Sequence, residues 1–246
     1  MSHFDWGPLD AADEEMGDGQ IAVWAAEQLR HPPAQPFFMA LGFYRPHIPL
    51  YAPRKYFELY EKLLTPYSYQ RFSIVENFLS TGYSMPTFTL LGQDVVRLPF
   101  IVETSLGHEI LHQWFGNSVF GDNGKGNWEE GLTTYLADHW YEEQKGKGWE
   151  YRKQLLVNYG AYVNSGHEDP LSEFRSRTDL ASRAIGYGKA AMVFHLLRTM
   201  TGDEAFFGAL KDLIEQRQFT TANWDDIRSS AGSPRSEGAR LPSGSA

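Results

Sequence analysis

Apolar residues recur at helical spacing through most of the second half of the chain, and this periodicity is the strongest constraint on the fold. The segments that show it are residues 103–116, 128–144, 148–163, 183–200 and 203–216. Earlier in the chain the pattern predicts helices over 21–30 and 54–64, and strands over 37–42, 72–76 and 87–91. We therefore expect an α+β fold that is mainly helical, with a small strand region before the helices.

Composition argues against a nucleic-acid partner and against a membrane span. The 246 residues are 42% apolar and 15% aromatic, which is enough to bury a sizeable core. The formal net charge of −9 argues against a nucleic-acid partner. Because no apolar run approaches the roughly 20 residues that span a bilayer, we expect no membrane span. The first residues, MSHFDWGPLD, lack the basic start and the apolar stretch of a signal peptide, so we expect a soluble chain.

The absence of cysteine narrows the chemistry of any metal site, because histidine and carboxylate side chains then have to hold the ion. Residues 108–112 read HEILH. His108 and His112 are four positions apart and so share one face of a helix, as two ligands of one zinc ion do. Glu109 lies between them, where it can accept a proton from water. The plain alternative is an amphipathic helix with two surface histidines.

A catalytic zinc ion takes three protein ligands, so the two histidines need a further partner. The metzincin continuation HxxGxxH is excluded, because Phe115 and Ser118 occupy the positions of its glycine and its third histidine. Residues 127–135, NWEEGLTTY, offer Glu129 and Glu130 on a second helix. A glutamate from that helix, packed against the first helix, would complete a site of two histidines and one glutamate.

These motifs together resemble the aminopeptidase N and leukotriene-hydrolase family of gluzincin metallopeptidases. The resemblance rests on HEILHQWFGN and on Glu130 followed by glycine. Seventeen residues separate His112 from Glu130, where the family commonly has eighteen. The resemblance implies a thermolysin-like catalytic domain with one Zn²⁺ per chain, held by His108, His112 and Glu130. It also implies that Glu109 is the catalytic base, and it leaves Glu129 as the second choice for the third ligand.

Two further segments extend the resemblance, each with departures. Residues 73–77, SIVEN, keep only the Glu-Asn of the family's GxMEN exopeptidase signature. The match implies that Glu76 and Asn77 bind the substrate, with Glu76 on its free α-amino group. Residues 187–190, YGKA, resemble the family's YxKG segment without its glycine. This second match implies that Tyr187 donates a hydrogen bond to the oxyanion of the tetrahedral intermediate.

The function that the resemblance implies is that of a zinc-dependent metallopeptidase. With the exopeptidase signature included, it implies an aminopeptidase that removes N-terminal residues from peptides with a free N-terminus. Bond cleavage would proceed by attack of a metal-activated water. Members of the family normally add a β-rich domain before the catalytic domain and a helical domain after it. No segment of this sequence resembles either of these two domains.

Residues 1–60 resemble a different family, the sulfatases of the alkaline-phosphatase-like superfamily. This resemblance rests on residues 36–49, PFFMALGFYRPHIP, in which His47 matches a histidine near the sulfate ester. The CxPSR or SxPSR nucleophile motif of sulfatases is missing. We therefore expect a sulfatase-like fragment over 1–60, a zinc metallopeptidase catalytic domain over 61–230 and a disordered tail over 231–246. The alternatives are a sulfatase-type hydrolase fragment and a catalytically inactive fusion fragment.

Overall fold

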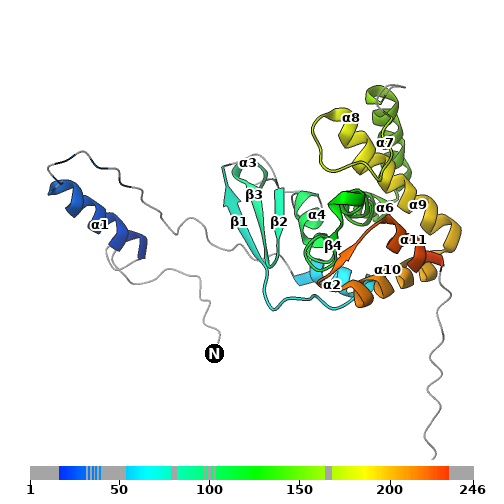
Figure 1. Cartoon of the computed structure of the whole chain (residues 1–246), viewed down its shortest axis with the longest axis horizontal. Helices are drawn as coiled ribbons and strands as arrows, with labels where there is room; N and C mark the ends of the chain where they lie inside the picture. The colour runs from blue at the N-terminus through cyan, green and yellow to red at the C-terminus, as the bar shows by residue number, and fades with distance from the viewer. Residues whose placement is uncertain are drawn as a thin grey trace, which may run out of the picture. The chain divides into compact units, whose positions relative to one another are not determined.

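Two compact units, Met1–Leu50 and Tyr51–Ala246, make up the chain in the computed structural model (Figure 1). The first unit contributes helix α1 (Gly17–Arg30). None of the described helices has the length and apolar character needed to cross a membrane. His47 and most of the strand expected over 37–42 lie outside the described residues. The structure describes residues 17–31, 33, 35, 37, 39, 54–78, 82–96, 98, 101, 104–163 and 168–232.

A three-stranded sheet opens the second unit. Strand β1 (Ser73–Asn77) pairs in parallel with β3 (Phe88–Gly92), and β2 (Gly82–Met85) pairs with β3 in antiparallel. The strand order is therefore β1-β3-β2, with β2 at one edge. This edge lies beside helix α4 (Ser105–Leu111), as Figure 1 shows. The sheet thus presents β2, and not β1, to the helical part of the unit.

Strand β2 lies between the strands predicted over 72–76 and 87–91 and was not itself predicted. Its side chains alternate, with Gly82 and Ser84 partly buried and Tyr83 and Met85 exposed. A tight connection leads into β3, and Thr87 there has a φ of 74°. Glycine, serine and proline around this strand resemble turn residues, which explains why the sequence pattern missed it.

Long helical runs build the rest of the second unit. One run comprises α5 (Glu129–Thr133), the π-helical segment η4 (Thr134–His139) and α6 (Trp140–Gln144). Another comprises α8 (Leu180–Arg183), the π-helical segment η5 (Ala184–Lys189) and α9 (Ala190–Thr201). The remaining long helices are α7 (Gly148–Tyr162), α10 (Asp203–Arg217) and α11 (Trp224–Gly232). These runs match the predicted mainly helical α+β fold, although α11 was not predicted.

Short elements connect the long ones. They are α3 (Gln93–Val96), β4 (Phe120–Gly121), η3 (Asn123–Lys125) and β5 (Thr221–Ala222). Helix α4 is also shorter than the predicted 103–116. It ends at Leu111 because the chain turns back: the N–H of Asn117 donates to the carbonyl of His112, and Gly116 adopts a φ of 121°. Glycine adopts this backbone conformation without the strain of a Cβ atom.

A close helix–helix contact sets the distance between two of the helical runs. A Cβ atom on Gly131 of α5 would overlap the Cβ of Ala190 at the start of α9. The missing side chain therefore lets the two backbones approach each other closely. Trp114, Trp128 and Phe194 are fully buried in the core around this contact. The contact places the run that contains Glu130 next to the run that contains Tyr187.

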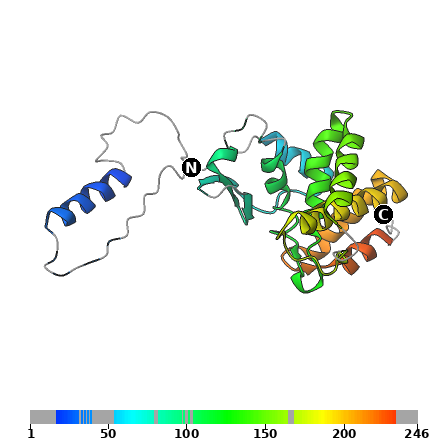
Figure 2. The ribbon, with the colours of Figure 1, turned by 90° about the horizontal axis from the view of Figure 1, so that it is seen from above.

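Helix α2 (Arg54–Leu63) packs into the core of the second unit (Figure 2). Tyr60 is fully buried, its hydroxyl donates to the carbonyl of Gly107 at 3.4 Å, and its ring lies 5.8 Å from that of Trp114. The two structural units therefore divide after Leu50, about ten residues before the junction expected from the sequence.

Candidate metal centre and its cleft

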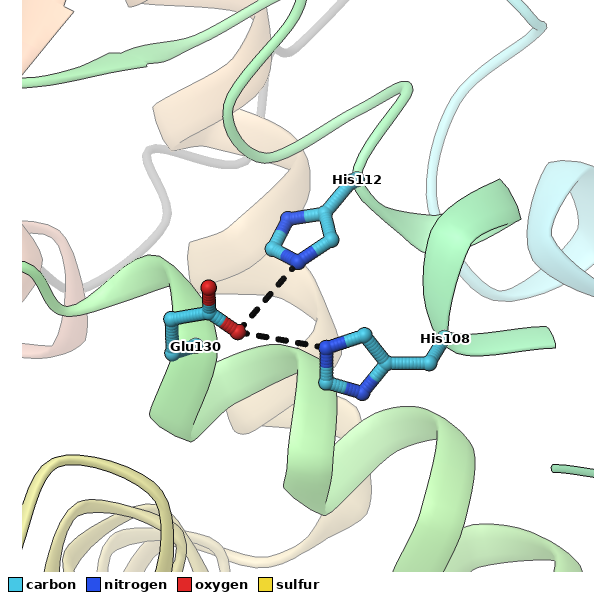
Figure 3. Close-up of side chains that lie close together, drawn as sticks. All are labelled: His108, His112 and Glu130. Atoms are coloured by element: carbon cyan, nitrogen blue, oxygen red, sulfur yellow. Dashed lines mark hydrogen bonds and ion pairs between the residues drawn. The ribbon is translucent and has the colours of Figure 1, made fainter. Parts of the chain in front are cut away.

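His108, His112 and Glu130 point toward one another in the second unit (Figure 3). Helix α4 supplies His108, His112 directly follows its last residue, and the first turn of α5 supplies Glu130. Glu130 Oε2 lies 3.2 Å from His108 Nε2 and 3.5 Å from His112 Nε2. All three ligand atoms are within 4.8 Å of one another. The structure therefore brings together the three residues that the sequence predicted as zinc ligands.

The outer nitrogen of each imidazole is held by a hydrogen bond. His108 Nδ1 lies 3.1 Å from Asp138 Oδ2, and His112 Nδ1 lies 3.0 Å from the carbonyl oxygen of Phe115. These bonds aim the two Nε2 atoms at the centre, as the outer hydrogen bonds of metal-bound histidines usually do. Sequence reasoning missed Asp138. Its signal was its spacing, because eight residues after Glu130 is about two helical turns and hence the same face.

The donor set fits a zinc ion. Tetrahedral zinc with bonds of about 2.0–2.1 Å places its ligand atoms about 3.3 Å apart, close to the 3.2 and 3.5 Å separations seen here. Burial opposes ionisation of Glu130, but the charges and hydrogen bonds of His112 and His108 hold its pKa well below the usual range. Glu130 is therefore ionised at neutral pH, as a zinc ligand must be.

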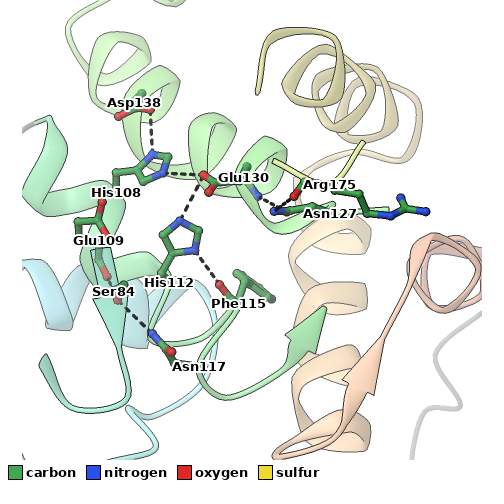
Figure 4. Close-up of polar contacts among 10 residues, drawn as sticks. All are labelled: Ser84, His108, Glu109, His112, Phe115, Asn117, Asn127, Glu130, Asp138 and Arg175. Carbon is green, nitrogen blue, oxygen red and sulfur yellow. Dashed lines mark hydrogen bonds and ion pairs between the residues drawn. The ribbon is translucent and has the colours of Figure 1, made fainter. Parts of the chain in front are cut away.

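Glu129, the second choice for the third ligand, has another partner. Its carboxylate accepts a hydrogen bond from the backbone N–H of Gly121 at 2.6 Å. A Cβ atom on Gly121 would overlap this carboxylate, so the glycine makes room for it. Asn127 holds the same helix start, because its side-chain oxygen accepts from the N–H of Glu130 and its side-chain nitrogen donates to the carbonyl of Arg175 (Figure 4).

Glu109 lies beside the metal centre in a tightly enclosed position. The residue is only 7% exposed, and a Cβ atom on Gly82 would overlap its carboxylate. Burial raises the pKa of this carboxyl group, against the opposite effect of the neighbouring histidines His112 and His108. A buried carboxylate with a raised pKa is a stronger proton acceptor than one in water, which suits a general base.

Ser84 on β2 ties the edge strand to the helix that contains HEILH (Figure 4). Its hydroxyl donates to the backbone carbonyl of Glu109 at 2.8 Å. The same oxygen accepts from the side-chain amides of Gln113 at 2.6 Å and Asn117 at 3.0 Å. One donor and two acceptor positions use the full hydrogen-bonding capacity of a serine hydroxyl. Gly82, two residues earlier, is thereby held against the Glu109 carboxylate.

Tyr187 lies on η5 next to the metal centre. Its ring is nearly parallel to that of His108, with centroids 6.4 Å apart and planes 12° apart. Burial, followed by the negative charge of Glu130, raises the pKa of its phenol well above the usual range. The hydroxyl therefore stays protonated at neutral pH and can donate a hydrogen bond to a developing oxyanion.

A cleft of about 1180 Å³ surrounds these residues and exceeds the ~300–1,000 Å³ typical of small-molecule sites. Gly82, Tyr83 and Ser84 of β2 form part of one wall, and the segment from Arg175 to Tyr187 contributes to another. Strand β1 contributes none of the described residues that line the cleft. Glu76 and Asn77, predicted to bind the substrate, lie on β1 and are separated from β2 by β3.

Comparison with known protein families agrees with this geometry. A family model described as the peptidase family M1 domain matches residues 99–238, which is more than half of the chain. The chain belongs to peptidase family M1. The match includes His108, His112, Glu130 and Tyr187, but it begins after the three-stranded sheet.

Relatives of this M1 chain include several peptidases. It is 25% identical to leukotriene A-4 hydrolase of Xenopus laevis in an alignment of 186 residues that covers 67% of this chain and 30% of that protein. It is 26% identical to mitochondrial aminopeptidase 2 of Saccharomyces cerevisiae over 129 residues, 49% of this chain and 13% of that protein. The chain thus spans less than a third of either relative.

Solved structures show the same M1 fold. The M1 zinc metallopeptidase from Deinococcus radiodurans superposes with a TM-score of 0.57 at 19% identity, covering 77% of this chain and 42% of that one. At its N-terminus the chain is similar to another protein. A sulfatase of Formosa agariphila is 48% identical over 64 residues, 25% of this chain and 13% of that protein. This stretch is too small a part of the sulfatase to define the family of the chain.

Proposed function

We propose that this M1 chain is the catalytic part of a zinc metallo-aminopeptidase that removes N-terminal residues from peptides. The observation that supports the proposal is the convergence of His108, His112 and Glu130, with Glu109 beside them in an open cleft. Two of the M1 relatives are named as an aminopeptidase and as leukotriene A-4 hydrolase, and both names fit a hydrolase.

Five side chains divide the proposed reaction between them. One zinc ion on His108, His112 and Glu130 would supply Lewis acidity, which acidifies water and polarises a peptide carbonyl. Glu109 accepts the proton of the attacking water and delivers it to the leaving amine. Tyr187 donates its phenolic hydrogen to the oxygen that becomes negatively charged in the tetrahedral intermediate.

Recognition of the free N-terminus is a separate part of the proposal. Its proposed partners, Glu76 and Asn77, come from the sequence resemblance alone, since β1 contributes none of the described cleft residues. If the two residues act as proposed, the Glu76 carboxylate forms an ion pair with the substrate's α-ammonium group. Asn77 follows it on the same strand.

Zinc content and hydrolysis test the proposal in sequence. We expect about one zinc per chain by elemental analysis of the purified parent, and much less in a Glu130→Ala variant, because two histidines alone form an incomplete site. The zinc-loaded parent should hydrolyse aminoacyl fluorogenic substrates. A Glu109→Gln variant should keep its zinc and lose about 10²–10⁴-fold in kcat, because the general base is gone. A folded parent that takes up no zinc contradicts the metal site. A zinc-loaded parent that cleaves no peptide contradicts the enzymatic role.

A further inference from the structure

The carboxylates of the cleft, apart from that of Glu109, already have partners in the described part of the chain. They face the two histidines, a backbone N–H or a lysine, and they are Glu130, Asp138, Glu129 and Glu142. Arg175 is also engaged, because its guanidinium donates to the carbonyl oxygens of Ser172 at 2.7 Å and Gly124 at 2.9 Å. These side chains therefore hold the cleft together.

Three charged side chains of the cleft make no hydrogen bond or ion pair with any described residue: Glu109, Arg177 and Arg183. Glu109 has a proposed role as general base. The two arginines have none, and both are exposed to solvent within the cleft. These two arginines have no anionic partner among the described residues, although the protein has an excess of acidic residues and a net charge of −9. They are available for an anionic group that arrives with the substrate.

Both arginines lie on the wall of the cleft that includes Tyr187. Arg183 is the last residue of α8 and precedes Tyr187 by four positions in one continuous helical run, so both can face the cleft. The charge of Arg177 is near enough to act on the Tyr187 hydroxyl. The start of α8 is fixed between them by a capping box, in which Asp179 and Ser182 bind each other's backbone.

We propose that Arg177 and Arg183 form a subsite for a carboxylate of the peptide substrate. This inference rests on the proposed peptidase function and adds a preference to it. A guanidinium group binds a carboxylate through two parallel hydrogen bonds, which an ammonium group cannot reproduce. Arg183 and Tyr187 are four residues apart, which is a rise of about 6 Å along the helix. Two residues of an extended peptide span roughly the same length. A substrate carboxylate within about two residues of the scissile bond therefore matches the distance from Tyr187 to Arg183.

Two kinds of substrate present this carboxylate close to the scissile bond: a short peptide with a free C-terminus, and a peptide with an aspartate or glutamate side chain. Three probes distinguish them, namely Ala-Ala-Ala as the free acid, Ala-Ala-Ala amide and Ala-Glu-Ala amide. We expect the zinc-loaded parent to cleave a probe with the matching carboxylate about 10–100-fold faster in kcat/KM than the neutral amide. The preference should weaken at high salt, because exposed charges are screened.

Substitutions then assign the preference to the two arginines. Arg177→Met, Arg183→Met and the double variant should lower kcat/KM for the carboxylate probe much more than kcat/KM for the neutral amide. Arg177→Lys should restore only part of the preference, because lysine lacks the planar fork. Arg228→Met is the matched control, since Arg228 is 81% exposed, pairs with Asp225 on α11 and does not line the cleft. It should leave both probes unaffected.

Binding keeps the test independent of turnover. The dissociation constants of Ala-Ala as the free acid and as the amide can be compared by calorimetry in the Glu109→Gln variant, with and without the two arginine substitutions, so that the peptide is not hydrolysed during the measurement. Tighter binding of the free acid that disappears in the double variant supports the subsite, even in a chain that cleaves nothing and so contradicts the proposed function. Equal constants and equal kcat/KM values for all probes overturn the subsite. A double variant that weakens neutral and charged probes alike also overturns it.

Discussion

The two walls of the cleft differ in what they contribute. The helical wall presents reactive side chains: His108, His112, Glu130 and Tyr187. The strand wall contributes Gly82, whose missing side chain leaves room for Glu109, and Ser84, whose hydroxyl fixes the distance to α4. One wall therefore provides the reactive groups, and the other holds them in position. Both are needed, because a displacement of about 1 Å can cost 10²-fold in rate.

Tyr187→Phe tests the helical wall and carries the largest expected effect. Removal of the phenolic hydroxyl should lower kcat by about 10²–10³-fold, because an oxyanion donor is lost. Zinc content should not change. Tyr159→Phe is the control, since the Tyr159 hydroxyl bonds Glu168 at 3.1 Å and lies outside the cleft. A Tyr187→Phe rate within twofold of the parent rate would remove this residue from the chemistry.

Gly82→Ala tests the strand wall. The added methyl group would overlap the Glu109 carboxylate and displace the general base, so kcat should fall by about 10²-fold with little change in KM or zinc content. Gly160→Ala is the matched control, because a Cβ atom there meets no atom within 4 Å. In the last turn of α7 that change should stabilise the helix by less than about 1 kcal/mol. Full activity of Gly82→Ala would show that the strand has no positioning role.

Asp138→Asn separates metal affinity from catalysis within the helical wall. An asparagine at position 138 can still form a hydrogen bond with His108, but it lacks the negative charge that makes the imidazole a stronger metal ligand. Zinc affinity should therefore fall by about 10–100-fold, measured by competition with a chelator. Asp225→Asn, at an exposed ion pair with Arg228, should leave the affinity unchanged. Unchanged affinity in both variants would contradict the orienting role of Asp138.

Glu76→Gln tests whether Glu76 binds the substrate, as the sequence resemblance implies, or lies too far from the cleft to do so, as its position on β1 implies. If Glu76 holds the substrate's α-ammonium group, KM for aminoacyl substrates should rise tenfold or more, or about 1.4 kcal/mol. Its position on β1, outside the described lining of the cleft, predicts a change of less than about threefold, under 1 kcal/mol. The proposed role of Glu76 requires the larger effect. A large rise would mean that the strand wall also binds substrate through β1.

The helical wall could be predicted from the sequence because its information is local. Two histidines four residues apart indicate a zinc site through their spacing, and the resemblance to the gluzincin family selects Glu130 on the next helix as the third ligand. Asp138 was within reach of the same reasoning, since it shares a helical face with Glu130. The strand wall could not be predicted from the sequence. The role of Gly82 depends on its contact with the Glu109 carboxylate, 27 positions later, and the pairing of β2 with β3 also depends on the folded structure. Serine, glycine and proline gave only a turn signal there.

The contact between Gly131 and Ala190 makes a buried backbone crossing into a point of control, one residue after Glu130 and three residues after Tyr187. Because the two backbones meet there without an intervening side chain, a larger residue at Ala190 would act as a wedge between the helical runs. The wedge would move the third metal ligand and the oxyanion donor apart in a single step. Loss of function from such a substitution would leave every reactive side chain chemically intact.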